Sequence, residues 1–128
     1  MPYQIIVCGG LAPDPLQTLE PVTTPAGPAL KNEMMLPAVF DPWASHALYE
    51  AAHLAKQHAG STIKVVSLAP KAKQQQVMMT VAQKLSFELV PLDGPGGGFT
   101  DAASVASALA EAIAAIPGLD QSQMLVFG

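Results

Sequence analysis

Short apolar segments rich in β-branched residues alternate along this chain with segments whose apolar residues recur at helical spacing. The strand-like segments are residues 3–8, 62–68, 87–90 and 124–127, and the helical segments begin at Asp41, Pro70 and Asp101. This alternation predicts a mainly parallel sheet, because right-handed crossovers lay one helix over the sheet after each strand. We therefore predict a single α/β domain over 1–128, doubly wound and Rossmann-like. Its expected strand order is 3-2-1-4, with the switch point between the first and fourth strands.

The connections carry signals of their own. Residues 11–41 are punctuated by prolines and are long for a strand-to-helix connection, so we expect an ordered surface excursion with a short hairpin at 20–24 and 31–35. Asp41 followed by proline is a favoured helix start, and Thr100 is the expected cap of the third helix. The inward face of that third helix is expected to consist of Val105, Leu109, Ala112, Ile113 and Ile116.

Charge and composition argue against several functions. The chain has a net charge of −4, a pI of about 5.1 and no basic run, which argues against binding to nucleic acid or to anionic membranes. We expect no membrane insertion, because no apolar stretch is long enough to span a bilayer, and no signal-peptide pattern is visible. The single cysteine cannot form an internal disulfide, so we expect a cytoplasmic protein. The last predicted strand ends where a ligand loop is expected to begin, which predicts a truncated piece of a longer protein.

Several glycine and polar motifs have simple structural explanations. Gly9-Gly10 follows the first strand without a Gly-x-Gly-x-x-Gly pattern, so a turn is favoured over phosphate binding. The glycine-rich segment at 94–98 lacks the Lys-Ser/Thr of a Walker loop, and a flexible loop is expected there. His46, Glu50 and His53 share one helix face, where a solvated polar surface is favoured over a metal site.

The sequence contains no convincing set of nucleophile, base and orienting residue, so an enzyme is the least expected class. Cys8 is expected to be a small buried hydrophobe rather than a reactive thiol. The best electrostatic feature is the helix start at Asp41, where free N–H groups favour an anion such as a phosphate, although the Asp41 carboxylate competes for them. Trp43 could offer a stacking face to an adenine, or could anchor a core or an interface.

Four segments, in order along the chain, resemble the beta subunit of electron transfer flavoproteins. Residues 5–15 resemble the apolar strand and Pro-Asp turn that open that family, and residues 40–43 with 47–54 resemble its Asn-Pro-Phe/Tyr element and the helix after it. Residues 65–70 are similar to its Val-x-Ser-x-Gly-Pro turn, and residues 123–128 to its strand Asp-Leu-Val-Leu-x-Gly. The resemblance covers the whole chain and about half of a family member. It implies a Rossmann-like fold of the adenine nucleotide alpha hydrolase-like kind.

The resemblance implies an electron carrier subunit that does no bond chemistry itself. Such a subunit pairs with the electron transfer flavoprotein alpha subunit, which holds most of the FAD, and the complex takes electrons from acyl-CoA or other dehydrogenases. The beta subunit also buries a structural AMP at the carboxyl ends of its strands. By position, the AMP contacts would correspond to Cys8, Asp41, Pro42, Trp43, Ala44, Leu68 and Gly128.

Two departures from the family bear on that nucleotide. Gly9-Gly10 stands where the family has Val-Lys, which removes a positive charge, and Asp41 stands where asparagine is usual. A carboxylate close to a phosphate is unfavourable unless it is turned away. Two alternatives therefore stay open. One is a stand-alone nucleotide-binding module of the universal stress type, although its Gly-x-x-Gly-x-Ser/Thr stretch is absent. The other is a structural paralogue that docks in a larger flavoprotein complex without a nucleotide.

Overall fold

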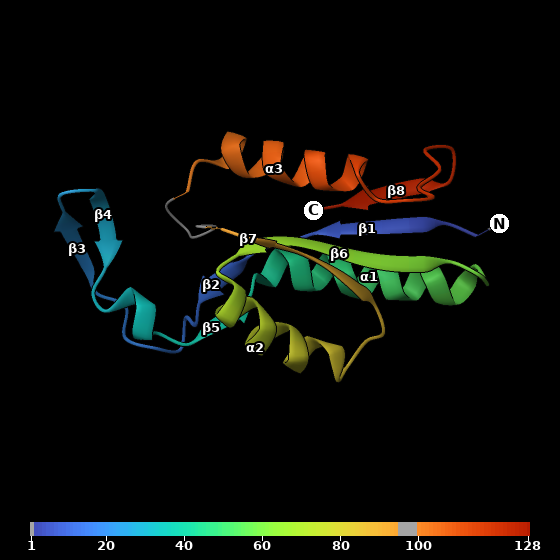
Figure 1. Cartoon of the computed structure of the whole chain (residues 1–128). Coiled ribbons are helices and arrows are strands. Elements are labelled where there is room, and N and C mark those ends of the chain that lie inside the picture. Colours follow the sequence, from blue (N-terminus) through green and yellow to red (C-terminus); the bar gives the residue numbers. More distant parts are fainter. Residues whose placement is uncertain (1, 95–99) are drawn as a thin grey trace.

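A computed structural model describes residues 2–94 and 100–128 (Figure 1). Its central sheet has four parallel strands in the order β7-β6-β1-β8, which confirms the predicted α/β class and the strand order 3-2-1-4. In parallel register Ile5 pairs with Ile63 on one side and with Leu125 on the other. The four strands are β1 (Gln4–Cys8), β6 (Thr62–Ala69), β7 (Glu88–Asp93) and β8 (Met124–Phe127).

Three helices cover the two faces of this sheet. Figure 1 shows α1 (Pro42–Gln57) and α2 (Lys71–Ala82) on one face and α3 (Ala102–Ala114) on the other. This arrangement is that of a doubly wound, Rossmann-like fold, as the alternation of strands and helices predicted. Among the residues that the structure describes, no helix is long and apolar enough to cross a membrane.

The main core lies between the sheet and the pair α1 and α2. Because side chains alternate across a strand, Ile5 and Val7 of β1 point to this face together with Val65 of β6, while Ile6 is buried on the other face. The helix α1 contributes two alanines, which allow close approach to the sheet, and one leucine, and α2 adds two larger apolar side chains. These five helical core residues are Ala44, Leu48, Ala51, Val77 and Met78.

The opposite face is covered less completely. The expected inward residues of α3 are only half-buried, and no residue of this helix is fully buried. On this face a single helix, packed mainly on β6, has to cover four strands. The apolar periodicity therefore predicted which side of α3 faces the sheet, but not how deeply its side chains are buried. Thr100 was expected to cap this helix, and that prediction is wrong: Asp101 is the cap, because its Oδ2 accepts the N–H of Ser104 at 3.1 Å.

The segment between β1 and α1 forms two antiparallel strand pairs. At its base β2 (Leu11–Pro13) pairs with β5 (Ala38–Phe40), and further out β3 (Pro21–Thr24) pairs with β4 (Gly27–Leu30). The predicted hairpin is present, but its second strand ends at Leu30 rather than spanning 31–35. Asn32 adopts a left-handed conformation with φ 55°, and a 3-10 turn, η1 (Glu33–Met35), follows it.

The third core strand is longer than predicted. It was expected at 87–90 and extends instead to Asp93, including Pro91. Proline is tolerated on an edge strand because the missing N–H would face solvent there, and β7 is an edge of the sheet. The strand is joined to β6 by an ion pair in which Lys64 Nζ lies 2.8 Å from Glu88 Oε2.

Candidate functional site

A groove lies at the carboxyl edge of the sheet, where β1 and β8 end side by side. Its volume is about 360 Å³, and it is open to solvent on one side. The carboxyl edge beside a switch point is where open α/β sheets bind ligands. Six of the seven residues that the resemblance assigned to AMP line this groove, and Pro42 is the one that does not; the six are Cys8, Asp41, Trp43, Ala44, Leu68 and Gly128.

The floor of the groove depends on a close contact between Gly9, the residue after β1, and the start of α1. A Cβ atom on Gly9 would lie 2.5 Å from Ala44 Cβ and 2.8 Å from Phe40 Cζ, so no larger residue fits at this position without a shift. Gly10 has no heavy atom within 4 Å of such a Cβ, and its carbonyl accepts the N–H of Asp41 at 2.9 Å. Gly9 is therefore needed for helix-on-strand packing, which the sequence interpretation as a simple turn did not anticipate.

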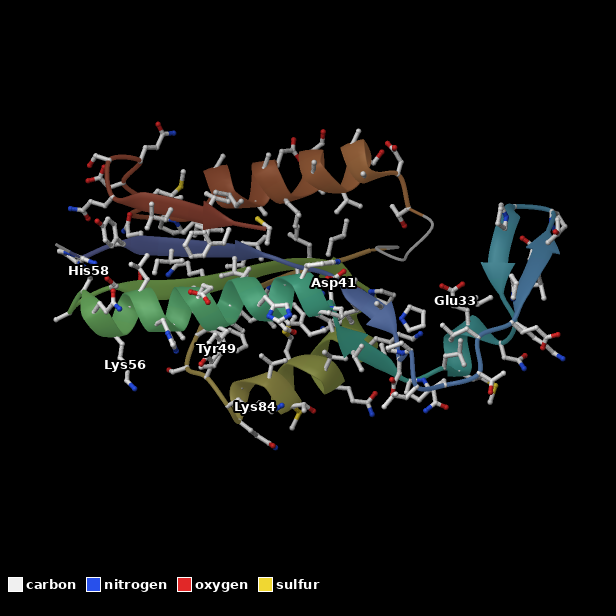
Figure 2. The ribbon with its side chains drawn as sticks, turned by 180° about the vertical axis from the view of Figure 1, so that it is seen from behind. Glu33, Asp41, Tyr49, Lys56, His58 and Lys84 are labelled. Carbon is white, nitrogen blue, oxygen red and sulfur yellow. The ribbon has the colours of Figure 1, made fainter. Side chains whose placement is uncertain are left out.

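The start of α1 forms one wall of the groove, and the Asp41 side chain caps the N-terminus of this helix. Asp41 Oδ1 accepts the Trp43 N–H at 2.8 Å, which confirms Asp41 as the N-cap. Figure 2 shows Asp41 at the start of α1, at the end of the sheet nearest the β3–β4 hairpin. A helix N-terminus favours anions through its free N–H groups, but here a carboxylate already takes one of them.

The side chains of the groove are mostly apolar and uncharged. Among the described residues that line it, Asp41 carries the only charged side chain, and no lysine or arginine is present. Burial raises the pKa of the Cys8 thiol, so this group stays protonated and neutral near neutral pH. This favours a hydrophobe over a reactive thiol, but Cys8 was expected to be buried and is only half-buried, because it lines the groove.

Three apolar residues line the groove without having been predicted as site residues: Leu11, Val105 and Leu109. The last two come from α3, which crosses over the sheet between β7 and β8 and so closes the groove from the second face (Figure 1). Sequence periodicity had assigned both to the inward side of a helix. Only the crossover geometry shows that the N-terminal part of this helix reaches the carboxyl edge.

Trp43 is a prominent aromatic residue beside the groove. Its side chain is 78% exposed, which excludes the interpretation as a core residue and leaves the stacking and interface interpretations open. The indole lies 6.5 Å, between ring centroids, from His46 in a tilted arrangement. A large aromatic surface left in solvent at the mouth of a groove is available to a ligand or to another protein.

The other sequence motifs do not gather at this edge. The described residues contain no cluster of three or more potential metal-ligating side chains, and His53 instead packs on Tyr49 with 4.4 Å between ring centroids. His46, Glu50 and His53 are all exposed, which confirms the predicted solvated helix face. Of the glycine-rich segment at 94–98, only Gly94 is described, and its N–H donates to the Ala69 carbonyl at 3.4 Å. The remainder, with the phosphate contact considered for it, lies outside the described residues.

Comparison with models of known protein families found no match for this sequence. No curated protein matches it significantly either. Function must therefore be argued from the groove itself and from the motifs that resemble electron transfer flavoproteins.

Proposed function

We propose that this chain is a noncatalytic subunit of the electron transfer flavoprotein beta type, and that its groove holds the adenosine part of AMP. The observation that carries the proposal is that six residues chosen from separate sequence motifs line one groove at the carboxyl edge of the sheet. These residues come from the ends of β1, β6 and β8 and from the start of α1. Such convergence at a switch point is typical of nucleotide sites in this architecture.

The lining suits a base and a sugar better than a phosphate. A volume of about 360 Å³ lies in the range of small-ligand sites, and Leu68, Val105 and Leu109 offer apolar surface to a flat ring. Gly9 and Gly10 also line the groove, although the Gly9 N–H and the Gly10 carbonyl are already hydrogen-bonded to Val66 and Asp41. A phosphate finds no cationic side chain among the described lining residues, and the Asp41 carboxylate opposes it.

In this proposal the electron-carrying group belongs to a complex rather than to this chain alone. The FAD is shared with, and mostly held by, an alpha-type partner subunit, and acyl-CoA or other dehydrogenases supply the electrons. The complex works in the cytoplasm, and this chain makes and breaks no bonds. Support for a partner comes from apolar side chains left in solvent, of which Trp43 borders the groove itself.

A second candidate function is a structural subunit that keeps the fold and the partner but has lost the nucleotide. The observation that favours it is that the described lining contains one carboxylate, that of Asp41, and no lysine or arginine. In the resembled family, asparagine is usual at the position of Asp41. Asparagine caps a helix as well as aspartate does, so the cap alone does not account for a negative charge at this position.

Two measurements test the proposal. The natural gene product, tagged and purified from its source cells, is expected to carry a flavin absorption spectrum, a second polypeptide and AMP released by heating. The purified protein is expected to be stabilised by AMP and by adenosine, because a ligand at about 100 times its dissociation constant adds roughly 2.7 kcal/mol to the free energy of unfolding. A colourless single polypeptide without nucleotide, with no thermal shift from AMP, ADP, ATP or adenosine, would refute it.

The substitution Asp41→Asn separates the two candidates. It keeps a good helix cap and removes the charge from the groove. If AMP binds there, its affinity should rise several-fold in this variant, since an unfavourable charge pair is removed, while the affinity for uncharged adenosine should change less than about twofold. The structural-subunit candidate predicts no binding of either compound to either protein. Calorimetric titration measures both affinities directly.

A further inference from the structure

Residues 14–36, between β2 and β5, form an arm whose outer part, the β3–β4 hairpin, stands away from the rest of the chain (Figures 1 and 2). Its base is fixed to the body. The Asp14 N–H donates to the Pro37 carbonyl at 2.9 Å, Lys73 Nζ of α2 donates to the Glu33 carbonyl at 3.1 Å, and β5 ends in the buried Phe40. The β3–β4 hairpin further out makes its main contacts within itself. A two-stranded hairpin is marginal in water without a surface to pack on, so this arm is suited to a partner.

Exposed apolar side chains collect on the arm. Leu16 is 90% exposed, Met35 is 85% exposed, and Leu19 is also exposed. Trp43 follows shortly after the arm rejoins the body of the protein. Large apolar residues that gather in one part of a surface, rather than singly, indicate a site of protein association. Both figures show the arm extending beyond the carboxyl edge of the sheet, so a partner held by it would lie on the same side as the groove.

The edges of the hairpin are poor templates for an added strand. Glu20 and Lys31 form a hydrogen-bonded pair, in which the Lys31 N–H donates to the Glu20 carbonyl at 2.8 Å. Hydrogen-bonded pairs alternate with non-hydrogen-bonded pairs along an antiparallel ladder. The pairs Pro21–Leu30 and Thr23–Pro28 are therefore not hydrogen-bonded to each other, and their backbone groups point outward. Pro21 and Pro28 occupy such outward positions in β3 and β4, and neither has an N–H to donate. Proline removes one of the two outward N–H groups of each strand, which disfavours strand pairing and leaves the side-chain faces for docking.

The net charge of the arm and of the rest of the chain limits which partners are electrostatically compatible. The arm holds three carboxylates and one lysine, and the rest of the chain holds seven carboxylates and five lysines. Both parts are acidic, so phosphate-rich surfaces such as nucleic acid or anionic membrane are repelled. Association with a second copy of this chain would place the acidic arm against the acidic body of the other copy, which is also electrostatically unfavourable. The complementary surface is an apolar patch bordered by lysine or arginine.

We propose that the arm docks a different polypeptide whose contact surface is apolar and bordered by basic side chains. The inference shares with the proposed function only the need for a partner chain, and it holds whether or not that partner carries a flavin. The arm acts through exposed side chains such as Leu16 and Leu19, which the body of the protein does not need for its own core. Substitutions there therefore test docking without disturbing the fold.

The experiment begins in the source cells with a photo-crosslinking amino acid at position 16, or at Tyr49 as a control. Tyr49 is also exposed, but it lies on α1, away from the arm (Figure 2). The polypeptide captured through position 16 is then purified, and its affinity is measured for the natural chain, for Leu16→Ser/Leu19→Ser and for Tyr49→Ser. The double variant should bind at least about tenfold more weakly, because apolar anchors dominate interfaces. The Tyr49 variant should bind within about twofold, and affinity should fall as salt rises.

Three results would overturn the proposal: no product through position 16, a product that is a second copy of this chain, or a purified partner that binds the double variant as tightly as the natural chain. A colourless partner that depends on the arm would sink the electron-transfer proposal and leave this one standing. A flavin-carrying partner that binds without the arm would do the reverse.

Discussion

Replacing Gly9 by alanine tests the contact that joins the groove floor to the core. The added Cβ would lie 2.5 Å from Ala44 Cβ and within 2.9 Å of two ring atoms of Phe40. Ordinary contact begins near 3.4 Å, so the strand and the helix must separate by roughly 1 Å. Neither neighbour can rotate away easily: Ala44 Cβ is fixed to the helix backbone, and both residues are buried. Overpacking of this kind costs about 1–3 kcal/mol, and we expect a value in the upper half of that range.

Urea denaturation of four variants provides the measurement: Gly9→Ala, Gly10→Ala, Ala44→Gly and the double variant Gly9→Ala/Ala44→Gly. With a denaturant slope of about 2 kcal/mol per molar, Gly9→Ala should lower the midpoint by roughly 1 M. Gly10→Ala is the matched control, because nothing lies within 4 Å of its added atom, and it should stay within about 0.5 kcal/mol of the natural protein. Adding Ala44→Gly to Gly9→Ala removes the closest clash, so the two substitutions should show a favourable coupling energy of about 1 kcal/mol or more. Equal midpoints for Gly9→Ala and Gly10→Ala would refute the packing argument.

Three further outcomes are expected. Asp41→Ala removes the cap on Trp43 and should cost about 1 kcal/mol of stability, whereas Asp41→Asn should cost less than half of that in the same urea assay. Because burial raises the pKa of Cys8, the unfolded chain ionises first, so stability should fall as the pH rises above about 8.5; Cys8→Ala should lack this fall. The Ser122 hydroxyl, 2.7 Å from the carboxylate of Asp120, helps to hold the pKa of that group below its usual value. Ser122→Ala should raise this pKa in an NMR titration, and an unchanged value would contradict the assignment.

The sheet could be predicted because its two central strands, β1 and β6, are buried on both faces. Ile5-Ile6-Val7 and Val65-Val66 are continuous apolar runs, and alternation with helical segments leaves few ways to connect them. Local choices were harder to predict. The strand expected at 87–90 continues through Pro91 to Asp93, because a missing N–H costs little on an edge. Asp101 displaced Thr100 as a cap because its carboxylate reaches the N–H and the hydroxyl of Ser104 together.

The groove was predictable to the extent that topology defines it. Parallel strands deliver their carboxyl ends to one edge, so Cys8, Leu68 and Gly128 had to lie near one another once the strand order was known. Val105 and Leu109 depend on where α3 crosses the sheet, and a helical period does not contain that information. The need for glycine at position 9 comes from a contact across 35 residues, with Ala44, and no local pattern reveals it.

Asp41 links the fold of this chain to its chemistry. A carboxylate at the first turn satisfies an N–H of α1 and interacts favourably with the helix dipole, by about 0.3–1 kcal/mol. The same charge stands in a groove that has no cationic side chain among its described residues, so it works against any anion that would otherwise use the helix start. Asparagine would cap the helix without this penalty. The residue present therefore favours uncharged ligand groups in the groove, and a phosphate, if one is bound, must keep its distance from Asp41.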